Sequence, residues 1–317
     1  MRKLITIAST MLIVGLAWFF TELFNFSTVP VRDGDIYAES EGEPPIPMYK
    51  SHKLPDSIDF AGEQVPLQYF DVAESLDREL QVNTYWHSQT IHILKKMPRY
   101  FSQIEPILKE EGVPEDFKYL AIAESALNER AVSPSSAVGL WQFMKATARE
   151  YGLEVTAEVD ERYHIEKSTR AACKYLKSAY KKYGSWTMVA AAYNAGRTGM
   201  SRQIVRQKEK DYYNLLLNPE TSRYVFRIVA MKLVLNNPKK YGFYIEDEDK
   251  YPIIPTYTIE VKSAVKNFAD FAKSHDENYK ILKYFNPWLR QSYLNNTAKK
   301  TYQIVLPKRG FREGVSK

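Results

Sequence analysis

The sequence predicts a mainly α-helical protein that ends in a small α+β module. Between residues 67 and 240, apolar residues recur at helical spacings of three and four, and no segment alternates as a strand does. After residue 250 the period changes. The segments "TYTIEV" and "TYQIVLP" alternate, and "AVKNFADFA" between them has helical spacing. At 317 residues the chain is long enough for one or two domains with sizeable cores.

Five parts are expected along the chain. Residues 25–66 mix acids, glycine and prolines without a sustained period, which predicts an extended linker. An acidic stretch at 246–249 marks a second boundary. The expected parts are an N-terminal anchor or signal at 1–24, the linker at 25–66, a helical part at 67–113 that packs on the main domain, the main helical domain at 114–240, and the α+β module at 251–317.

The N-terminal segment is apolar enough to enter a membrane. Arg2 and Lys3 precede residues 4–20, which are all apolar or small. This length is at the lower limit for a spanning helix and above the core of a typical signal peptide. Because no A-x-A cleavage site follows, we expect an uncleaved anchor with its positive end in the cytoplasm. A cleaved signal peptide is the alternative, and either case predicts that the body of the protein is exported.

The helices of the main region have recognisable ends. Helical spacing begins at Leu67, and "RYFSQIEPILKEEG" predicts a helix that Gly112 stops. Pro114 is expected to open the next helix as a first-turn residue. Three later helices are "STRAACKYLKSAYKKYG", capped by Ser168 and ended by Gly184, "WTMVAAAYNAG", closed by Gly196, and "TSRYVFRIVAMKLVL", capped by Thr221.

Composition narrows the classes of partner and cofactor. The formal net charge of +6 suits an acidic polymer or an anionic membrane surface. Basic and acidic residues are interleaved, however, and no nucleic-acid motif is present, so we expect no nucleic-acid binding. The lone Cys173 permits no internal disulfide. Only His87 and His92 are close in sequence, at a spacing that suits no common zinc pattern, so we expect no metal and no other cofactor.

One acid stands on an apolar helical stripe. In "DFKYLAIAESALNE", residues Phe117, Leu120, Ala121 and Glu124 share one helical face. A carboxyl group buried among such neighbours loses hydration, which raises its pKa by up to ~3–5 units at full burial. A carboxylic acid that stays protonated near neutral pH can protonate the departing oxygen of a glycosidic bond. The alternative is a structural Glu124 that lies at the helix end, points outward or pairs with a basic side chain.

The sequence around Glu124 resembles the soluble-lytic-transglycosylase family, whose fold is lysozyme-like. The resemblance is carried by Glu124-Ser125, "AVSP" at 131–134, "GLWQ" at 139–142, "AYNAG" at 192–196 and "ETSRYV" at 220–225. Their order and spacing agree with the family pattern over residues 116–225. The upstream segment "YFSQIEPILKEEGVPEDFKYLA" resembles the membrane-bound transglycosylase D type. The resemblance therefore implies a lysozyme-like catalytic domain at 114–240.

The resemblance implies a reaction with a single protein carboxylate. Glu124 would act first as acid and then as base, cleaving the bond between N-acetylmuramic acid and N-acetylglucosamine in peptidoglycan. The muramyl 6-hydroxyl would attack its own anomeric carbon and leave a 1,6-anhydro end. A hydrolytic glycosidase usually requires a second carboxylate, and Glu129, Glu158 and Asp160 are the nearby acids. A lysozyme-type hydrolase and a non-catalytic peptidoglycan-binding scaffold are the alternatives.

Matched positions imply supporting roles for residues on the segment that follows this acid. Ser133, together with Ser135, would hydrogen-bond Glu124 or the N-acetyl group of the substrate, or would cap its own loop. Gln142 would bind an N-acetyl carbonyl through its amide, or would be a helical glutamine that faces solvent.

The downstream motifs add two tyrosines and an asparagine. Tyr193 and Asn194 lie at the end of an apolar helix, where a phenol and an amide can present polar tips to a sugar. Tyr224 would orient Glu124 through its hydroxyl, or pack as an ordinary core tyrosine. Glu220 is expected to stabilise the helix terminus that follows it.

The chain departs from the commonest family pattern at a few positions. Trp141 replaces the commoner Met, Ser136 stands where many members have Gly, Lys145 where many have Pro, and Tyr163-His164 replaces a frequent Asp-Pro. None of these changes removes an expected catalytic group, so they concern loop shape and subsite preference.

The C-terminal module resembles a degenerate LysM domain, a βααβ unit that binds N-acetylglucosamine chains. "YTIEV", "NPWL" and "YQIVLP" fit that pattern, but Lys262-Ser263 replaces the usual Gly-Asp-Thr after the first strand. These resemblances imply peptidoglycan glycan strands as the partner, with no protein partner identified. Together with residues 4–20 they predict a place in the cell envelope, anchored to a membrane and facing the periplasm.

Overall fold

The structure, a computed structural model, describes residues 50–312. The anchor or signal expected at 1–24 and most of the linker expected at 25–66 lie outside the described residues. Within residues 50–312, no helix is both long and apolar enough to cross a membrane.

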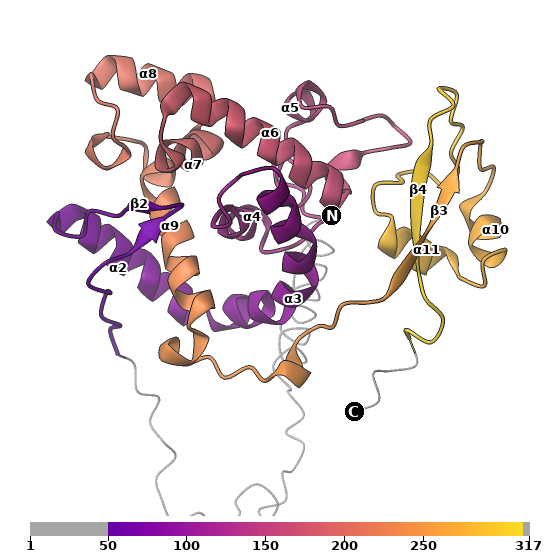
Figure 1. Ribbon diagram of the computed structural model, residues 1–317, viewed down its shortest axis with the longest axis horizontal. Coiled ribbons are helices and arrows are strands. Elements are labelled where there is room, and N and C mark those ends of the chain that lie inside the picture. The colour runs from indigo at the N-terminus through magenta and orange to yellow at the C-terminus, as the bar shows by residue number, and fades with distance from the viewer. Residues whose placement is uncertain (1–49, 313–317) are drawn as a thin grey trace, which may run out of the picture. The chain divides into compact units, whose positions relative to one another are not determined.

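Helices dominate the described chain, so the mainly α-helical prediction is confirmed. Those before residue 250 are α2 (Phe70–Tyr85), α3 (His87–Glu110), α4 (Phe117–Ser125), α5 (Lys145–Glu150), α6 (Ile165–Tyr183), α7 (Trp186–Ala195), α8 (Arg197–Gln207) and α9 (Pro219–Asn236). The short α4 lies inside a ring formed by α2, α3, α6, α7 and α9 (Figure 1), and it packs directly on α3 and α9.

Helix α4 is central because its sequence is apolar on nearly every side. Phe117 and Leu120 are completely buried, and Ile122 on another face is 1% exposed. Burial of each such side chain contributes roughly 1.5–3 kcal/mol. After α4 the chain turns sharply, because Ala126 and Leu127 both adopt left-handed backbone conformations, with φ of 50° and 55°. This conformation costs non-glycine residues about 1–2 kcal/mol each, so packing of the core holds a strained turn directly after Glu124.

Two helices begin at residues other than those expected. Helix α3 begins at His87 and continues through Pro98, whereas the sequence pattern suggests a start after this proline. Helix α4 begins at Phe117, because Pro114 lies in the preceding turn.

Two helix caps also differ from the sequence prediction. Helix α9 is capped by Asn218, whose side-chain oxygen accepts hydrogen bonds from the backbone of Glu220 and Thr221, both at 3.0 Å. Thr221 is therefore inside the first turn. Helix α6 begins at Ile165 after a cap at His164, and Ser168 is a buried residue one turn further on.

The linker expected at 25–66 ends earlier than predicted. Strands β1 (Asp59–Phe60) and β2 (Glu63–Gln64) form a short antiparallel hairpin. Phe60 is completely buried, with its ring centroid 5.4 Å from that of Phe117. The Glu63 carboxylate accepts hydrogen bonds from the backbone of Trp186 and Thr187 at the start of α7, where a negative charge is favourable. An acid that suggests solvated linker in the sequence thus serves as a helix cap.

The C-terminal module has the βααβ order expected from the sequence. Strand β3 (Thr256–Val261) pairs antiparallel with β4 (Tyr302–Pro307), and α10 (Phe268–Lys273) and α11 (Tyr279–Phe285) lie between them in the chain. Its hydrophobic core also includes Val138, Val159 and Tyr163 of the main helical region. The module and the segment around residues 138–163 therefore share one core.

Candidate active site

A cleft of about 590 Å³ lies where α2, α3, α4 and α9 meet the loop that follows α4. Glu124, Ser133 and Gln142 line it, together with Arg223 and Arg227 of α9. Three of the site residues suggested by sequence thus line one cleft, one from the end of α4 and two from the loop that follows it.

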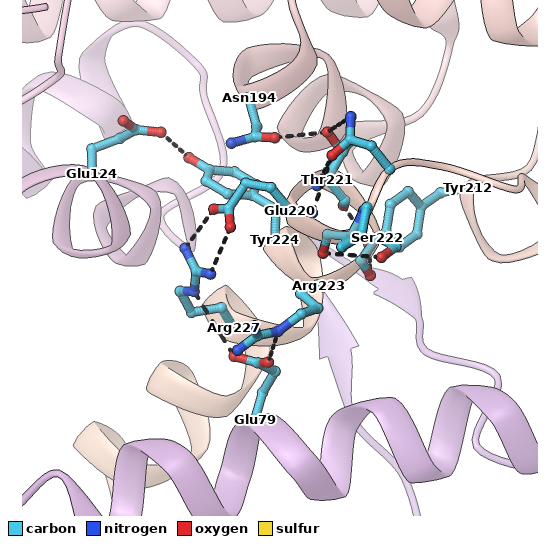
Figure 2. Close-up of polar contacts among 12 residues, drawn as sticks. Glu79, Glu124, Asn194, Tyr212, Glu220, Thr221, Ser222, Arg223, Tyr224 and Arg227 are labelled. Atoms are coloured by element: carbon cyan, nitrogen blue, oxygen red, sulfur yellow. Dashed lines mark hydrogen bonds and ion pairs between the residues drawn. The ribbon is translucent and has the colours of Figure 1, made fainter. Parts of the chain in front are cut away.

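Glu124 lies at the C-terminal end of α4 and contacts a buried tyrosine of α9. Tyr224, only 2% exposed, donates its hydroxyl hydrogen bond to Glu124 Oε1 (Figure 2). Burial raises the pKa of Glu124 to about 7, against the opposing effects of the Tyr224 hydrogen bond and the positive charge of Arg227. A carboxyl group with this pKa is about half protonated at neutral pH, so it can donate a proton and afterwards accept one.

The arginines beside Glu124 are engaged by other carboxylates. Arg227 Nη1 and Nη2 lie 3.0 and 3.4 Å from the two oxygens of Glu220. Arg223 Nε lies 2.6 Å from Glu79 Oε1, and Arg227 Nε lies 3.8 Å from Glu79 Oε2 (Figure 2). Within the described residues Glu124 has no ion pair of its own, so its protonated form is not displaced by a paired cation.

The residues on the loop after α4 have mainly internal hydrogen bonds. Ser133 Oγ accepts from the backbone of Ala137 at 3.0 Å. Gln142 is outside any helix, with φ of 48°, and its side-chain nitrogen donates to Gly139 O at 2.8 Å and Ala131 O at 3.3 Å. Ser135 is exposed and does not line the cleft. Ser133 and Gln142 therefore brace the loop at the edge of the cleft.

Tyr193 and Asn194 do not line this cleft. Tyr193 Oη donates to the backbone oxygen of Trp141 at 2.6 Å. Asn194 Oδ1 accepts from Thr221 Oγ1 at 2.8 Å (Figure 2). These contacts tie α7 to the Gln142 loop and to the start of α9, the helix that carries Tyr224.

Arg162, which does not line the cleft, holds the Gln142 loop in place. This buried arginine pairs with Asp160 at 2.7 Å and donates to the backbone oxygens of Ser136 and Phe143 at 3.2 and 3.1 Å. Gly139, with φ of 83°, approaches so closely that an added Cβ would lie 2.0 Å from Arg162 O. Only glycine fits this position without movement of the backbone.

The acids near Glu124 in sequence are committed elsewhere. Asp160 pairs with Arg162, and Glu158 accepts from the backbone and side chain of Asn295 at 2.8 and 2.6 Å. Glu129 accepts the hydroxyl hydrogen bond of Tyr100. None of these three acids lines the cleft that contains Glu124.

One acid that does line the cleft comes from far earlier in the chain. Glu79 on α2 is 1% exposed, and its Oε2 is buried without a hydrogen bond. Glu79 is not among the site residues expected from sequence, although the local pattern indicates it, because it lies beside Leu76 and Leu80 on the buried side of α2. This is the same anomaly, an acid on an apolar helical face, that singles out Glu124.

Comparisons with known proteins agree with this arrangement. Residues 102–216 match the transglycosylase SLT domain, and residues 257–310 match the soluble lytic transglycosylase C-terminal LysM-like domain. The chain is 28% identical over 243 residues to membrane-bound lytic murein transglycosylase D of Escherichia coli K12, a match that covers 75% of this chain. It spans 52% of the length of that relative.

Two solved structures to which this chain is similar are those of lytic transglycosylases. The 70 kDa soluble lytic transglycosylase of Escherichia coli is 22% identical, with a TM-score of 0.38 over 44% of this chain and 24% of that one. An inactive variant of the lytic transglycosylase Slt of Pseudomonas aeruginosa is 20% identical, with a TM-score of 0.35 over 49% of this chain and 26% of that one. From the domain matches and the curated relative, the chain combines a transglycosylase SLT domain with a LysM-like domain of the soluble lytic transglycosylase type, and it is homologous to membrane-bound lytic murein transglycosylase D.

Proposed function

We propose that this chain is a peptidoglycan lytic transglycosylase that acts in turnover or remodelling of the cell wall. It cleaves the β-1,4 bond between N-acetylmuramic acid and N-acetylglucosamine without water and leaves 1,6-anhydromuramyl ends. The proposal rests on the environment of Glu124. This acid lines the cleft, burial raises its pKa to about 7, and its carboxylate accepts a hydrogen bond from Tyr224.

The chemistry follows from one acid with two protonation states. Protonated Glu124 donates its proton to the departing glycosidic oxygen as the bond to the anomeric carbon breaks. The resulting carboxylate then takes the proton of the muramyl 6-hydroxyl while that oxygen bonds to the anomeric carbon. Tyr224 holds the carboxyl group in place in both steps. Ser133 and Gln142 hold the adjacent loop, and Tyr193 and Asn194 position the segments that carry Gln142 and Tyr224.

A hydrolase would need a second carboxylate to activate water or to act as nucleophile. Glu79 lines the cleft, but it is 1% exposed and paired with Arg223. A carboxylate that is held by an arginine and is nearly closed to solvent is not free to activate a water molecule or to attack the anomeric carbon. The arrangement therefore supports the transglycosylase over the hydrolase.

We further propose that the protein is located in the cell envelope. The relative from Escherichia coli K12 is described as a membrane-bound lytic murein transglycosylase, and residues 4–20 of this chain supply an apolar segment for an anchor. The active site would then face the periplasm, where glycan strands are its substrate. The LysM-like module is proposed to bind the same strands.

The test is mass spectrometry of the products that the full-length chain releases from purified peptidoglycan, with Glu124→Gln as the control. Anhydromuramyl products from the parent alone are expected. Reducing muramyl ends would instead identify a hydrolase, and no release from either protein would indicate a non-catalytic scaffold.

A further inference from the structure

One wall of the cleft comes from outside the matched transglycosylase domain. Helix α2, the turn at Trp86 and the N-terminal part of α3 contribute cleft-lining residues, all of which precede residue 102, where the domain match begins. They are Glu79, Val82, Asn83, Trp86, Gln89, Thr90 and Ile93. This wall therefore adds to the cleft a surface that the domain match does not describe.

The wall presents an indole to solvent at the edge of the cleft. Trp86 is 57% exposed, whereas the tryptophans at 141 and 288 are buried, and Val82 in the preceding turn of α2 is 42% exposed. Val132, on the loop after α4, is 58% exposed and lines the same cleft. Several large apolar side chains that share a concave surface in this way are typical of a ligand site.

The backbone that carries Trp86 is firmly held. Its N–H donates to Val82 O at 3.0 Å, and its carbonyl accepts from Thr90 N at 3.1 Å. The buried Thr90 hydroxyl donates to Asn83 O at 2.7 Å, and the buried Asn83 amide donates to Glu79 O at 2.8 Å. The exposed indole is thus presented by a rigid turn, which lowers the entropy cost of using it to bind a ligand.

The chemistry of this wall matches a sugar ring. An indole has a flat apolar face, and a pyranose has an apolar face of C–H groups with polar groups at its rim. Gln89 lines the cleft next to Trp86, and within the described residues its side chain forms no hydrogen bond. A free amide at this place can pair with an N-acetyl group or a hydroxyl at the rim of the ring.

We propose that Trp86 is a stacking platform for a sugar ring of the glycan strand, bound on the α2–α3 side of Glu124, with Gln89 at the rim of that ring. The assignment rests on the proposed function, because it takes the glycan strand in the Glu124 cleft as the ligand. It makes the helical part before the transglycosylase domain a determinant of substrate affinity.

The test compares Trp86→Ala with Trp86→Phe in the full-length chain, using peptide-free glycan strands and, in parallel, strands that carry stem peptides as substrates. Tyr244→Ala is the matched control, because Tyr244 is 70% exposed and lies outside the cleft. For Trp86→Ala we expect KM to rise about tenfold with kcat within twofold of the parent. Trp86→Phe, which keeps an aromatic face, should recover most of the affinity, and Tyr244→Ala should match the parent.

Three results would overturn the platform. They are an unchanged KM for Trp86→Ala, a loss of kcat alone, and a rise in KM confined to strands that carry stem peptides, which would assign the wall to the peptide. Binding of chitohexaose to Glu124→Gln, with and without Trp86→Ala, separates this result from the proposed function. A loss of affinity there supports the platform even if the parent releases no anhydromuramyl product, and unchanged affinity refutes it even if the parent is active.

Discussion

The hydroxyl of Tyr224 hydrogen-bonds the carboxyl group of Glu124 across 100 residues of sequence. The two residues lie on α9 and α4, which pack directly on one another. This bond favours the charged form of Glu124, whereas burial favours the neutral form, and burial is the larger effect. The balance leaves the pKa of Glu124 at about 7, which suits a group that must both donate and accept a proton.

Removing the Tyr224 hydroxyl should shift the pH dependence of catalysis. Because the hydrogen bond lowers the pKa of Glu124, Tyr224→Phe is expected to raise that pKa further. The acid form would then persist to higher pH, so the alkaline limb of the plot of kcat/KM against pH should move to higher pH. At pH 6 kcat should fall, by about tenfold, because the acid is no longer held in place. Tyr193→Phe is the matched control, because the Tyr193 hydroxyl donates to Trp141 O and not to Glu124. The alkaline limb of this variant should lie at the same pH as that of the parent. A shift of the alkaline limb to lower pH in Tyr224→Phe would contradict the effect that we assign to the Tyr224 hydrogen bond.

The raised pKa of Glu124 also has a consequence for stability. The ordinary pKa of this carboxyl group, 4.5, applies in the unfolded chain, whereas burial raises its pKa to about 7 in the folded chain. The folded state therefore binds more protons between these values, and the free energy of unfolding should fall as pH rises from 4.5 to 7. The loss is at most about 3 kcal/mol, from 1.36 kcal/mol per unit of pKa.

Urea unfolding at pH 5 and pH 8 checks this effect. Glu124→Gln cannot ionise, so its stability relative to the parent should be greater at pH 8 than at pH 5. An equal difference at the two pH values would mean that Glu124 is not desolvated in the folded protein.

The sequence predicts the helical fold and part of the site for physical reasons. Helical spacing depends on burial, so the α4 stripe with Glu124 and both strands of the C-terminal module can be located from residues 116–129, 256–261 and 302–307 alone. The contact of Tyr224 with Glu124 is not visible in any local pattern. It was suggested by resemblance to a family, and its geometry depends on how α4 packs on α9.

The features that the sequence does not reveal are contacts between residues that lie far apart in the chain. Glu79 meets Arg223 across 144 residues, and no local rule pairs them. The caps at His164 and Asn218 are not expected from sequence, because Ser168 is a better cap residue by type than His164 and Thr221 is nearly as good as Asn218. Trp86 could not be assigned to the cleft, because exposure of an indole cannot be read from its spacing.

Glu79 is expected to stabilise the folded protein through its ion pair with Arg223. Glu79→Ala leaves Arg223 without its carboxylate, and Arg223 is 31% exposed, so water can solvate it in part. We expect a loss of about 2 kcal/mol in the free energy of unfolding, less than the 3–5 kcal/mol typical of a fully buried pair. Glu74→Ala on the exposed face of α2 is the control and should change stability by less than about 0.5 kcal/mol. Equal effects of the two variants in thermal unfolding would rule out the ion pair as a structural element.

Gly139 should be irreplaceable because of its approach to Arg162, and not only because of its backbone conformation. A Cβ at Gly139 would lie 2.0 Å from Arg162 O, whereas at Gly152, which also has a positive φ of 92°, no atom lies within 4 Å. Gly152→Ala therefore measures the strain of the left-handed conformation alone, about 1–2 kcal/mol. Gly139→Ala adds a clash with the backbone and is expected to cost at least about 1–3 kcal/mol more. It should also lower kcat, because the loop that holds Ser133 and Gln142 must move away from Arg162. If the two variants unfold at the same urea concentration, the close approach of Gly139 to Arg162 does not stabilise the loop, and the role that we assign to this contact is refuted.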